Sequence, residues 1–247
     1  MKTKLIITAF LFSFLMGKSQ IFSSDEKKNI VKTNLTAYAF RNYNISYERA
    51  LLKWLSINIS YGNMPKGSPP FKKFYLPEEN AGDFTDIELS NTQITIEPRF
   101  YLGGKGFGQG FYLAPYYRNS QFTIDNMVYQ FYSESLQNDL PINVSGKLSA
   151  NSFGLLIGNQ WALGRNKNWV IDFWILGGHY GKSKGTLTGK TTRKLTPQEQ
   201  AELKSEFDGQ DIPFIKYTTT TNEDGITVEL DGPWAGLRSG LSFGYRF

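Results

Sequence analysis

Charged side chains of both signs recur on the polar faces of several segments in which apolar and polar residues alternate. They are the first candidates for a functional site, because such groups can form ion pairs or bind a charged solute. In "TQITIEPRFYL", Glu97 and Arg99 lie two residues apart, so on an extended strand their side chains share one face. The complete set of charges on such faces is Glu48, Glu97, Arg99, Arg118, Asp172, Arg238 and Arg246. Because an unpaired charge inside a protein is costly, we expect opposite charges to pair as a structural network. The alternative is that the same residues line a path for a charged solute.

His179 is the only histidine, and it is the one candidate for acid–base catalysis near neutral pH. Ser183 follows it four residues later. A serine hydrolase triad is recognised by its geometry, and the sequence supplies no identifiable acid for this pair. We therefore expect His179 to be a polar loop residue, and we assign no catalytic residue.

Two glycine-rich segments share only composition with nucleotide-binding loops. The segment "GTLTGKT" (185–191) has three residues between its glycines, whereas a phosphate-binding loop needs four. The segment "GGKGFGQG" (103–110) lacks the spacing of the dinucleotide fingerprint and is typical of a flexible turn. The sequence therefore predicts no cofactor.

Acidic residues gather in two segments between the alternating runs. One holds Glu78, Glu79, Asp83, Asp86 and Glu88, and the other holds Asp208, Asp211, Glu223 and Asp224. The spacing of a calcium-binding EF-hand is absent, so we expect solvated loop charge and no metal site. The chain contains no cysteine, which excludes disulfides, cysteine metal sites and cysteine nucleophiles.

The first twenty residues, "MKTKLIITAFLFSFLMGKSQ", have the layout of a secretory signal peptide. Lysines come first, an apolar run follows over residues 5–16, and small residues precede Gln20. The run is shorter than the ~20 residues that a membrane-spanning helix needs. We expect cleavage after Ser19, which separates a signal peptide (1–19) from a single domain (20–247). Removing the three signal lysines lowers the formal net charge from +5 to +2, so no nucleic-acid partner is implied.

Eight segments alternate between apolar and polar residues with the period of two that a β-strand imposes. They lie at about residues 30–40, 42–50, 54–62, 92–102, 111–118, 151–161, 169–176 and 235–247, and the first is the least regular. In the last, "WAGLRSGLSFGYRF", Leu241, Phe243, Tyr245 and Phe247 share one face, while glycine, serine and arginine occupy the other.

The polar faces of these runs distinguish a lipid-exposed barrel from a soluble β-protein. They carry glycine, serine, asparagine, threonine and charges of both signs, whereas the exposed face of a soluble sheet is rich in lysine and glutamate. Small residues with a few charges suit a narrow barrel interior, and an apolar exterior suits lipid. We predict an all-β fold, an eight-stranded antiparallel up-and-down transmembrane β-barrel whose last strand closes against the first. A soluble lipocalin-like barrel, with larger apolar residues inside, is the alternative.

Short and long connections alternate along the chain, as in outer-membrane barrels with tight periplasmic turns and extended outer loops. The short ones lie at 51–53, 103–110 and 163–168, and the long ones at 63–91, 124–148 and 181–233. The tight link at 40–42 is the exception. Trp161 and Trp169 flank a short turn, and together with Tyr245 and Phe247 they predict an aromatic girdle at one membrane interface.

Two local features complete the predicted architecture. Pro98 and Pro115 lie inside predicted strands, where a hairpin turn at 103–110 would place them opposite each other, so we expect a kink or bulge. "LTPQEQAELKSEFDG" predicts a helix over about 197–208, with Thr196 as N-cap, Glu199 completing a capping box and Gly209 at its end. "TTTTNEDGITVEL" predicts a β-hairpin that turns near Asp224 and extends the barrel.

Three segments resemble a domain-of-unknown-function family of small secreted outer-membrane barrels: "NLTAYAFRNYNISYERALLKWLSI", "ITIEPRFYL" and "GFYLAPYYR". The resemblance covers about residues 30–247, and the overall scale is similar to the OmpA-type eight-stranded membrane domain. The alternation ending in Phe247 resembles the C-terminal signal by which bacterial outer-membrane barrels are recognised for assembly. The resemblance implies the outer membrane of a gram-negative bacterium, with lipid, lipopolysaccharide and the barrel-assembly machinery as partners, and it implies no activity.

The sequence thus predicts a non-enzymatic envelope protein whose outer loops bind a partner or shield the surface. Two alternatives remain, an outer-membrane lipid-modifying enzyme and a narrow solute pore.

Overall fold

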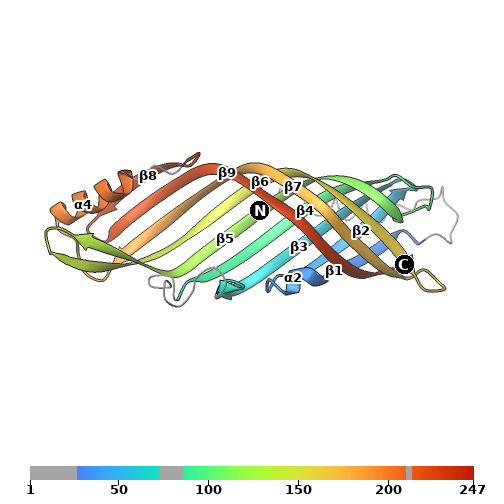
Figure 1. Cartoon of the computed structure of the whole chain (residues 1–247), viewed down its shortest axis with the longest axis horizontal. Coiled ribbons are helices and arrows are strands. Elements are labelled where there is room, and N and C mark those ends of the chain that lie inside the picture. Colours follow the sequence, from blue (N-terminus) through green and yellow to red (C-terminus); the bar gives the residue numbers. More distant parts are fainter. Residues whose placement is uncertain (1–26, 73–85, 210–212) are drawn as a thin grey trace, which may run out of the picture.

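The chain forms a closed antiparallel β-barrel in the computed structural model, which describes residues 27–72, 86–209 and 213–247 (Figure 1). The predicted signal peptide lies outside the described residues. The strands are β1 (Asn29–Asn34), β2 (Tyr43–Leu52), β3 (Leu55–Gly67), β4 (Glu88–Tyr101), β5 (Gly110–Ser133), β6 (Asn138–Leu163), β7 (Trp169–Thr191), β8 (Lys216–Asn222) and β9 (Gly225–Arg246). The helices are α2 (Leu35–Tyr38) and α4 (Pro197–Asp208). No helix in the described residues is long and apolar enough to cross a membrane.

Eight of these strands close the ring, and β8 stands outside it. Each ring strand pairs with its neighbour in sequence, except that β7 pairs with β9, which in turn pairs back onto β1. At the closure, Asn29 N donates to Phe247 O over 3.0 Å and Phe247 N donates to Asn29 O over 2.8 Å. The alternation that ends in Phe247 is therefore the closing strand, as predicted, and the eight-stranded antiparallel fold is confirmed.

The two ends of the barrel differ. The base, where Asn29 and Phe247 meet, carries the short turns between β2 and β3, β4 and β5, and β6 and β7. At the other end the strands are unequal, because β1 has 6 residues and β2 has 10, whereas β5, β6, β7 and β9 have 22 to 26. Most of the predicted loops at 124–148 and 181–233 are therefore wrong, since these residues continue as strands of a long extension (Figure 1).

This inequality interrupts the barrel wall beside β9. The edge of β9 pairs with β1 from Ser242 to Arg246 and with β8 from Gly225 to Asp231. Between them, within the described parts of the chain, residues 232–241 of β9 have no strand partner on that edge. Near the base the ring is closed by the β1–β9 pairing, and directly above β1 the helix α2 packs against β9 in place of a strand.

The far end of the extension, which we call the cap, has a hydrophobic core of its own. Phe131, Leu140, Ile142, Val144, Leu195, Leu203, Ile226 and Val228 form it. In α4, the predicted capping box is present: Glu199 N donates to Thr196 Oγ1 and Thr196 N donates to Glu199 Oε2. The helix buries Leu203, the hairpin β8–β9 turns between Asn222 and Gly225, and both predictions are confirmed.

Two local predictions are corrected. Residues 30–40 are not one strand, because β1 ends at Asn34, whose side chain accepts a hydrogen bond from Ala37 N and caps α2. Pro98 does lie opposite Pro115, since the register between β4 and β5 is the same on both sides of the unpaired stretch around them. No residue is inserted there, so the bulge is absent, and the irregularity at the two prolines is limited to residues 97–99 and 114–116, which do not pair between the two strands.

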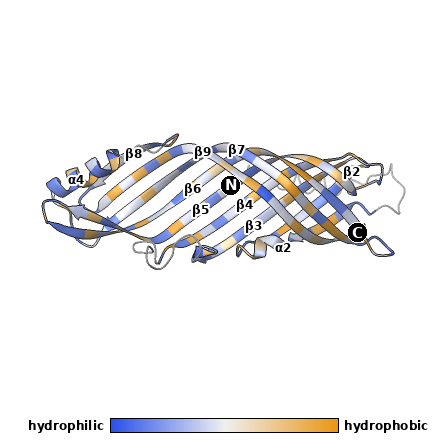
Figure 2. Ribbon diagram, viewed as in Figure 1, coloured by the Kyte–Doolittle hydropathy of each residue, from blue (hydrophilic) through white to orange (hydrophobic). Residues whose placement is uncertain are grey.

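In the part of the ring nearest the base, on the right in Figure 2, the outward-facing residues of the strands are mostly apolar. Exposed apolar side chains include Ile45, Ile57, Ile59, Ile94, Ile96, Leu155, Ile157, Phe173, Ile175 and Leu241. Aromatic residues lie at both limits of this band. Trp161, Trp169, Tyr245 and Phe247 are exposed near the base, and Tyr38, Phe40, Tyr43, Phe153 and Tyr180 are exposed at the opposite limit. We call this region the apolar band.

Candidate functional site

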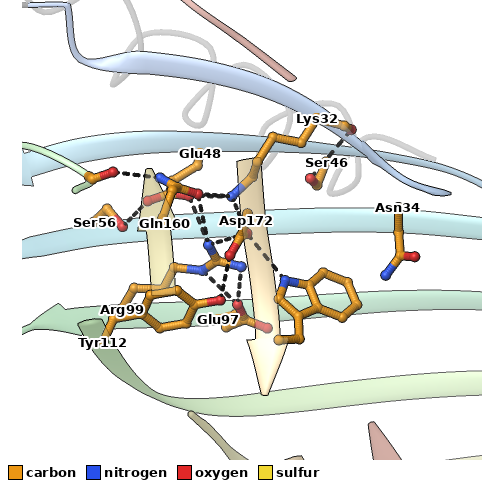
Figure 3. A network of polar contacts seen from close by, with 12 residues as sticks. Lys32, Asn34, Ser46, Glu48, Ser56, Glu97, Arg99, Tyr112, Gln160 and Asp172 are labelled. Carbon is orange, nitrogen blue, oxygen red and sulfur yellow. Dashed lines mark hydrogen bonds and ion pairs between the residues drawn. The ribbon is translucent and has the colours of Figure 1, made fainter. Parts of the chain in front are cut away.

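The interior of the ring holds a buried ion network centred on Arg99 of β4 (Figure 3). Arg99 Nη1 lies 2.7 Å from Asp172 Oδ2 and 3.1 Å from Glu48 Oε2, and its Nη2 lies 2.6 Å from Glu97 Oε1. All four side chains are fully buried. They meet because each occupies an inward position of its strand, one each on β2 and β7 and two on β4.

Lys32 of β1 is a second central cation, and the sequence analysis did not identify it. Its Nζ lies 2.5 Å from Glu48 Oε2 and 2.8 Å from Asp172 Oδ2, and it donates to Gln160 Oε1 over 2.7 Å. The side chain has no exposed surface. Lys32 lies on a short strand within the least regular of the eight segments. The residues around it do not alternate clearly, so the sequence did not indicate whether its side chain points inward.

Neutral donors occupy the remaining lone pairs of the carboxylates. Ser56 and Tyr101 each donate a hydroxyl hydrogen bond to Glu48 Oε1 over 2.6 Å. Tyr112 donates to Asp172 Oδ1 over 2.7 Å, and Trp174 Nε1 donates to Asp172 Oδ2 over 3.2 Å. A buried ion cluster of this kind is tolerated when its charges are paired and hydrogen-bonded, and here each carboxylate oxygen of Glu48, Glu97 and Asp172 accepts at least one hydrogen bond.

Arg238 of β9 extends the network upward from Glu97. Its Nη1 lies 3.1 Å from Glu97 Oε2, and its guanidinium lies over the rings of Tyr116 (4.5 Å) and Trp174 (4.6 Å). The face of an aromatic ring attracts a cation through its quadrupole. The two uncharged rings therefore hold the guanidinium of Arg238 in place without adding a negative charge. Three carboxylates thus face three cations, and the network is neutral.

Of the seven charges predicted to pair inside, five lie in the network and two lie elsewhere. Arg118 is above it and donates from Nε to Thr95 Oγ1 over 3.1 Å. Arg246 is at the base, where its Nε donates to Lys27 O over 2.8 Å. The four predicted girdle residues point outward, with Trp169 stacked on Phe243 at 5.3 Å between ring centroids.

The turn between β4 and β5 folds under the network and fills the base of the barrel. Phe107 is buried there, and Lys28 Nζ lies 5.1 Å from the centre of its ring. Gly108 O accepts a hydrogen bond from Gln160 Nε2 over 2.7 Å. This segment was predicted to be a flexible turn, and its packing instead continues the filled interior to the base.

His179 lies within β7 and not in a loop, so the expectation of a loop residue was wrong, and in the described residues its surroundings do not suit a hydrolase. Its Nδ1 lies 3.1 Å from Tyr116 OH, and Ser183 Oγ donates to Gly232 O over 3.3 Å. No carboxylate contact of His179 is present in the described residues. Within those residues no group of three potential metal ligands occurs either.

The acidic segments form ion pairs where they are described. Lys194 Nζ lies 2.7 Å from both Glu223 and Asp224, and Lys66 Nζ lies 3.1 Å from Glu88. Glu78, Glu79, Asp83 and Asp211 lie outside the described residues.

The chain matches no protein-family model and no curated protein, so the resemblance to a domain-of-unknown-function family has no family model behind it. Two solved structures from Acinetobacter baumannii, CarO2 and CarO, are similar to it. The alignment with CarO2 covers 90% of this chain and 98% of the CarO2 chain, at 11% sequence identity and a TM-score of 0.36. CarO covers 92% and 100%, at 10% identity and a TM-score of 0.36. Likeness of this degree assigns neither a family nor an activity.

Proposed function

We propose that this protein is an integral outer-membrane β-barrel of a gram-negative envelope, exported through the signal peptide 1–19. Its role is non-enzymatic and non-conducting, and its extension outside the membrane binds a partner or shields the surface. The partners of the barrel itself are outer-membrane lipid, lipopolysaccharide and, through β9, the barrel-assembly machinery.

The apolar band is the observation that carries this proposal. Isoleucine, leucine and phenylalanine cover the outward faces, while carboxylates, arginines and a lysine fill the inside. A soluble lipocalin-like barrel would have the opposite arrangement, because its interior would hold the large apolar residues. On β2 the outward positions from Tyr43 to Leu51 are apolar except for Arg49, and on β6 those from Phe153 to Trp161 are apolar except for Asn159. These lengths match the 9–11 tilted residues with which a strand crosses a bilayer.

The filled interior argues against a pore. Arg99, Lys32 and their carboxylate partners have no exposed side-chain surface. Beneath them, Phe107 and Ile30 are almost fully buried at the base. An eight-stranded ring is just wide enough for its own side chains, so we expect them to leave no continuous water path between the network and the wall.

The extension supports a recognition or shielding role. The cap has a packed core and a capped helix, so the outer part is an ordered surface rather than a set of loose loops. The extension carries a broad depression whose lining is mixed, with charged and hydroxyl side chains such as Lys147, Lys184 and Glu229 beside apolar ones such as Phe122, Leu148 and Leu230. An ordered surface of this mixed kind suits a partner that offers both polar and apolar groups.

Cell fractionation tests the location. The full chain should be recovered with the outer membrane, and its mobility on a gel should shift when the sample is boiled. Recovery in the soluble periplasmic fraction without a shift would contradict the proposal. In planar bilayers the purified protein should give no single-channel steps, and regular steps would favour the narrow solute pore.

A further inference from the structure

A small cavity lies inside the barrel between the ion network and α2. Its volume is about 50 Å³, and its polar lining includes Asn34, Asn42, Asn44, Gln93, Arg118 and Arg238. One water occupies ~10–15 Å³ of such a volume, so the cavity has room for roughly three to five waters or for one small oxyanion.

The cavity carries an excess positive charge. The carboxylates below it are each paired with Lys32, Arg99 or Arg238. Arg118 adds a fourth cation, and within residues 27–72, 86–209 and 213–247 it has no carboxylate partner. Its Nε donates to Thr95 Oγ1, and its guanidinium lies 5.9 Å from the centre of the Tyr116 ring.

The guanidinium of Arg238, the second in the cavity, has a hydrogen-bond donor that is not used by the described residues. Arg238 is 6% exposed, and its Nε is buried without a partner in the described part of the chain. Its Nη1 faces Glu97, and the rings of Tyr116 and Trp174 hold the group in place. A buried donor left without an acceptor is costly, so an acceptor in the cavity is favoured. Asn42 Oδ1 likewise has no hydrogen-bond partner in the described part of the chain. It can accept a hydrogen bond from a protonated oxygen of a group bound in the cavity.

We propose that this cavity binds a small oxyanion, a phosphate or a carboxylate, between Arg118 and Arg238. The planar guanidinium group matches the geometry of both anions. The amides of Asn34 and Gln93 supply further donors around it, whereas Asn44 Nδ2 already donates to Asn34 O and Asn42 O.

The edge of β9 beside the cavity lacks a strand partner over residues 232–241 of the described chain, and α2 lies against the lower end of that stretch. Arg238 belongs to this stretch. We take this edge as the route by which an anion reaches the cavity, from water or as the headgroup of an anionic lipid. The binding site goes beyond the proposed envelope role, and it does not depend on where the protein resides.

Calorimetric titration of the folded full-length mature protein in a neutral detergent, with inorganic phosphate as the probe, tests the site. Arg118→Gln removes the excess charge without depriving any carboxylate of its partner. Gln93→Glu places a carboxylate of nearly the same shape in the cavity. Arg165→Gln is the matched control, because Arg165 is exposed in the turn at the base, at the other end of the barrel. The heat-dependent gel shift verifies that each variant is folded.

We expect saturable phosphate binding by the unsubstituted protein and by Arg165→Gln. Both cavity variants should bind at least about tenfold more weakly, the loss expected for one charge-assisted hydrogen bond. An absence of saturable binding, or an unchanged affinity in Arg118→Gln, would overturn the proposal. If Arg118→Gln does not fold, an unchanged affinity in Gln93→Glu would overturn it in the same way.

A second titration with dioctanoyl phosphatidic acid distinguishes the two sources of the anion. Tighter binding of the lipid than of phosphate, lost in Arg118→Gln, supports a lipid headgroup in the cavity. Equal or weaker binding of the lipid, with phosphate binding still dependent on Arg118, supports a soluble anion. Lipid binding that is equal in Arg118→Gln and Arg165→Gln, without phosphate binding, would overturn the cavity as the site.

Discussion

Arg99 of β4 contacts Asp172 of β7 across the interior of the barrel, with 2.7 Å between Nη1 and Oδ2. The two strands share no hydrogen-bonded edge, because β5 and β6 separate them in the ring. The guanidinium also lies 4.4 Å from the centre of the Tyr112 ring on β5. The contact therefore braces two parts of the wall that backbone pairing alone does not connect.

Arg99→Met should strongly destabilise the barrel. The substitution leaves Glu48, Glu97 and Asp172 buried with only Lys32 and Arg238 to neutralise them. Removing one partner of a buried charge cluster costs about 3–5 kcal/mol. Urea unfolding of the protein in lipid vesicles measures this change, and Arg165→Met at the exposed turn should stay within about 0.5 kcal/mol of the parent. A loss below about 1 kcal/mol for Arg99→Met would show that the network is not a structural element.

Gly158→Ala should destabilise the barrel by overpacking. A Cβ atom at Gly158 of β6 would collide with the ring and hydroxyl of Tyr112, which holds Asp172. Forcing an extra carbon into a packed interior costs about 1–3 kcal/mol. Gly104→Ala is the control, because nothing lies within 4 Å of the added carbon there. Equal stability of the two variants by the same urea titration would mean that Tyr112 does not fill the interior at this level.

The cap should loosen in acid. Hydrogen bonds from Arg193 lower the pKa of Glu199 to about 2, from an ordinary value of 4.5. Because the folded-state pKa is lowered, this stabilisation is fully present above pH 4.5 and is lost as the pH falls toward 2. The capping box and its ion pair together stabilise α4 by roughly 1–2 kcal/mol.

Hydrogen exchange of the segment 197–208, corrected for the intrinsic rate at each pH, measures this loss. Protection of α4 should fall between pH 4.5 and 2 in the parent. In Glu199→Gln it should be lower at neutral pH and nearly independent of pH over that range. The same pH dependence in both proteins would assign the effect to other groups.

An arginine on the apolar band should be costly only where lipid covers it. Ile96 points outward from β4 within the band, and Thr186 points outward from β7 on the extension. Arginine at the bilayer midplane of a transmembrane barrel costs about 2–4 kcal/mol. Ile96→Arg should therefore lose about that much stability in vesicles, whereas Thr186→Arg should change it by less than about 0.5 kcal/mol. Equal effects would contradict the position assigned to the membrane.

The alternation of residues was sufficient to predict the ring, because an inward or outward position follows directly from a period of two. It placed Glu48, Glu97, Arg99, Asp172 and Arg238 on inward faces. It did not specify the positions of these residues along the barrel axis, which depend on strand register and tilt. Arg118 therefore lies above the network and Arg246 below it, although both share the inward parity.

Lys32 and the long extension escaped prediction for different reasons. β1 contributes only 6 residues before Asn34 caps α2, too few for a clear alternation around Lys32. In β5 the alternation changes phase at an irregularity between Ile124 and Met127, whereas the facing residues of β6 keep their phase. A single period does not continue through that point, so the segment 124–148 lacked the pattern of one strand.

Spin-label accessibility tests the central claim, that the apolar band faces lipid, most directly. The chain has no cysteine, so a single cysteine at Ile59 in the band or at Thr186 on the extension carries one label at a known place. In lipid vesicles, the label at Ile59 should collide frequently with oxygen and rarely with a water-soluble nickel complex. The label at Thr186 should show the reverse. Equal, high accessibility of both sites to the nickel complex would show that water surrounds the band, which would contradict the account.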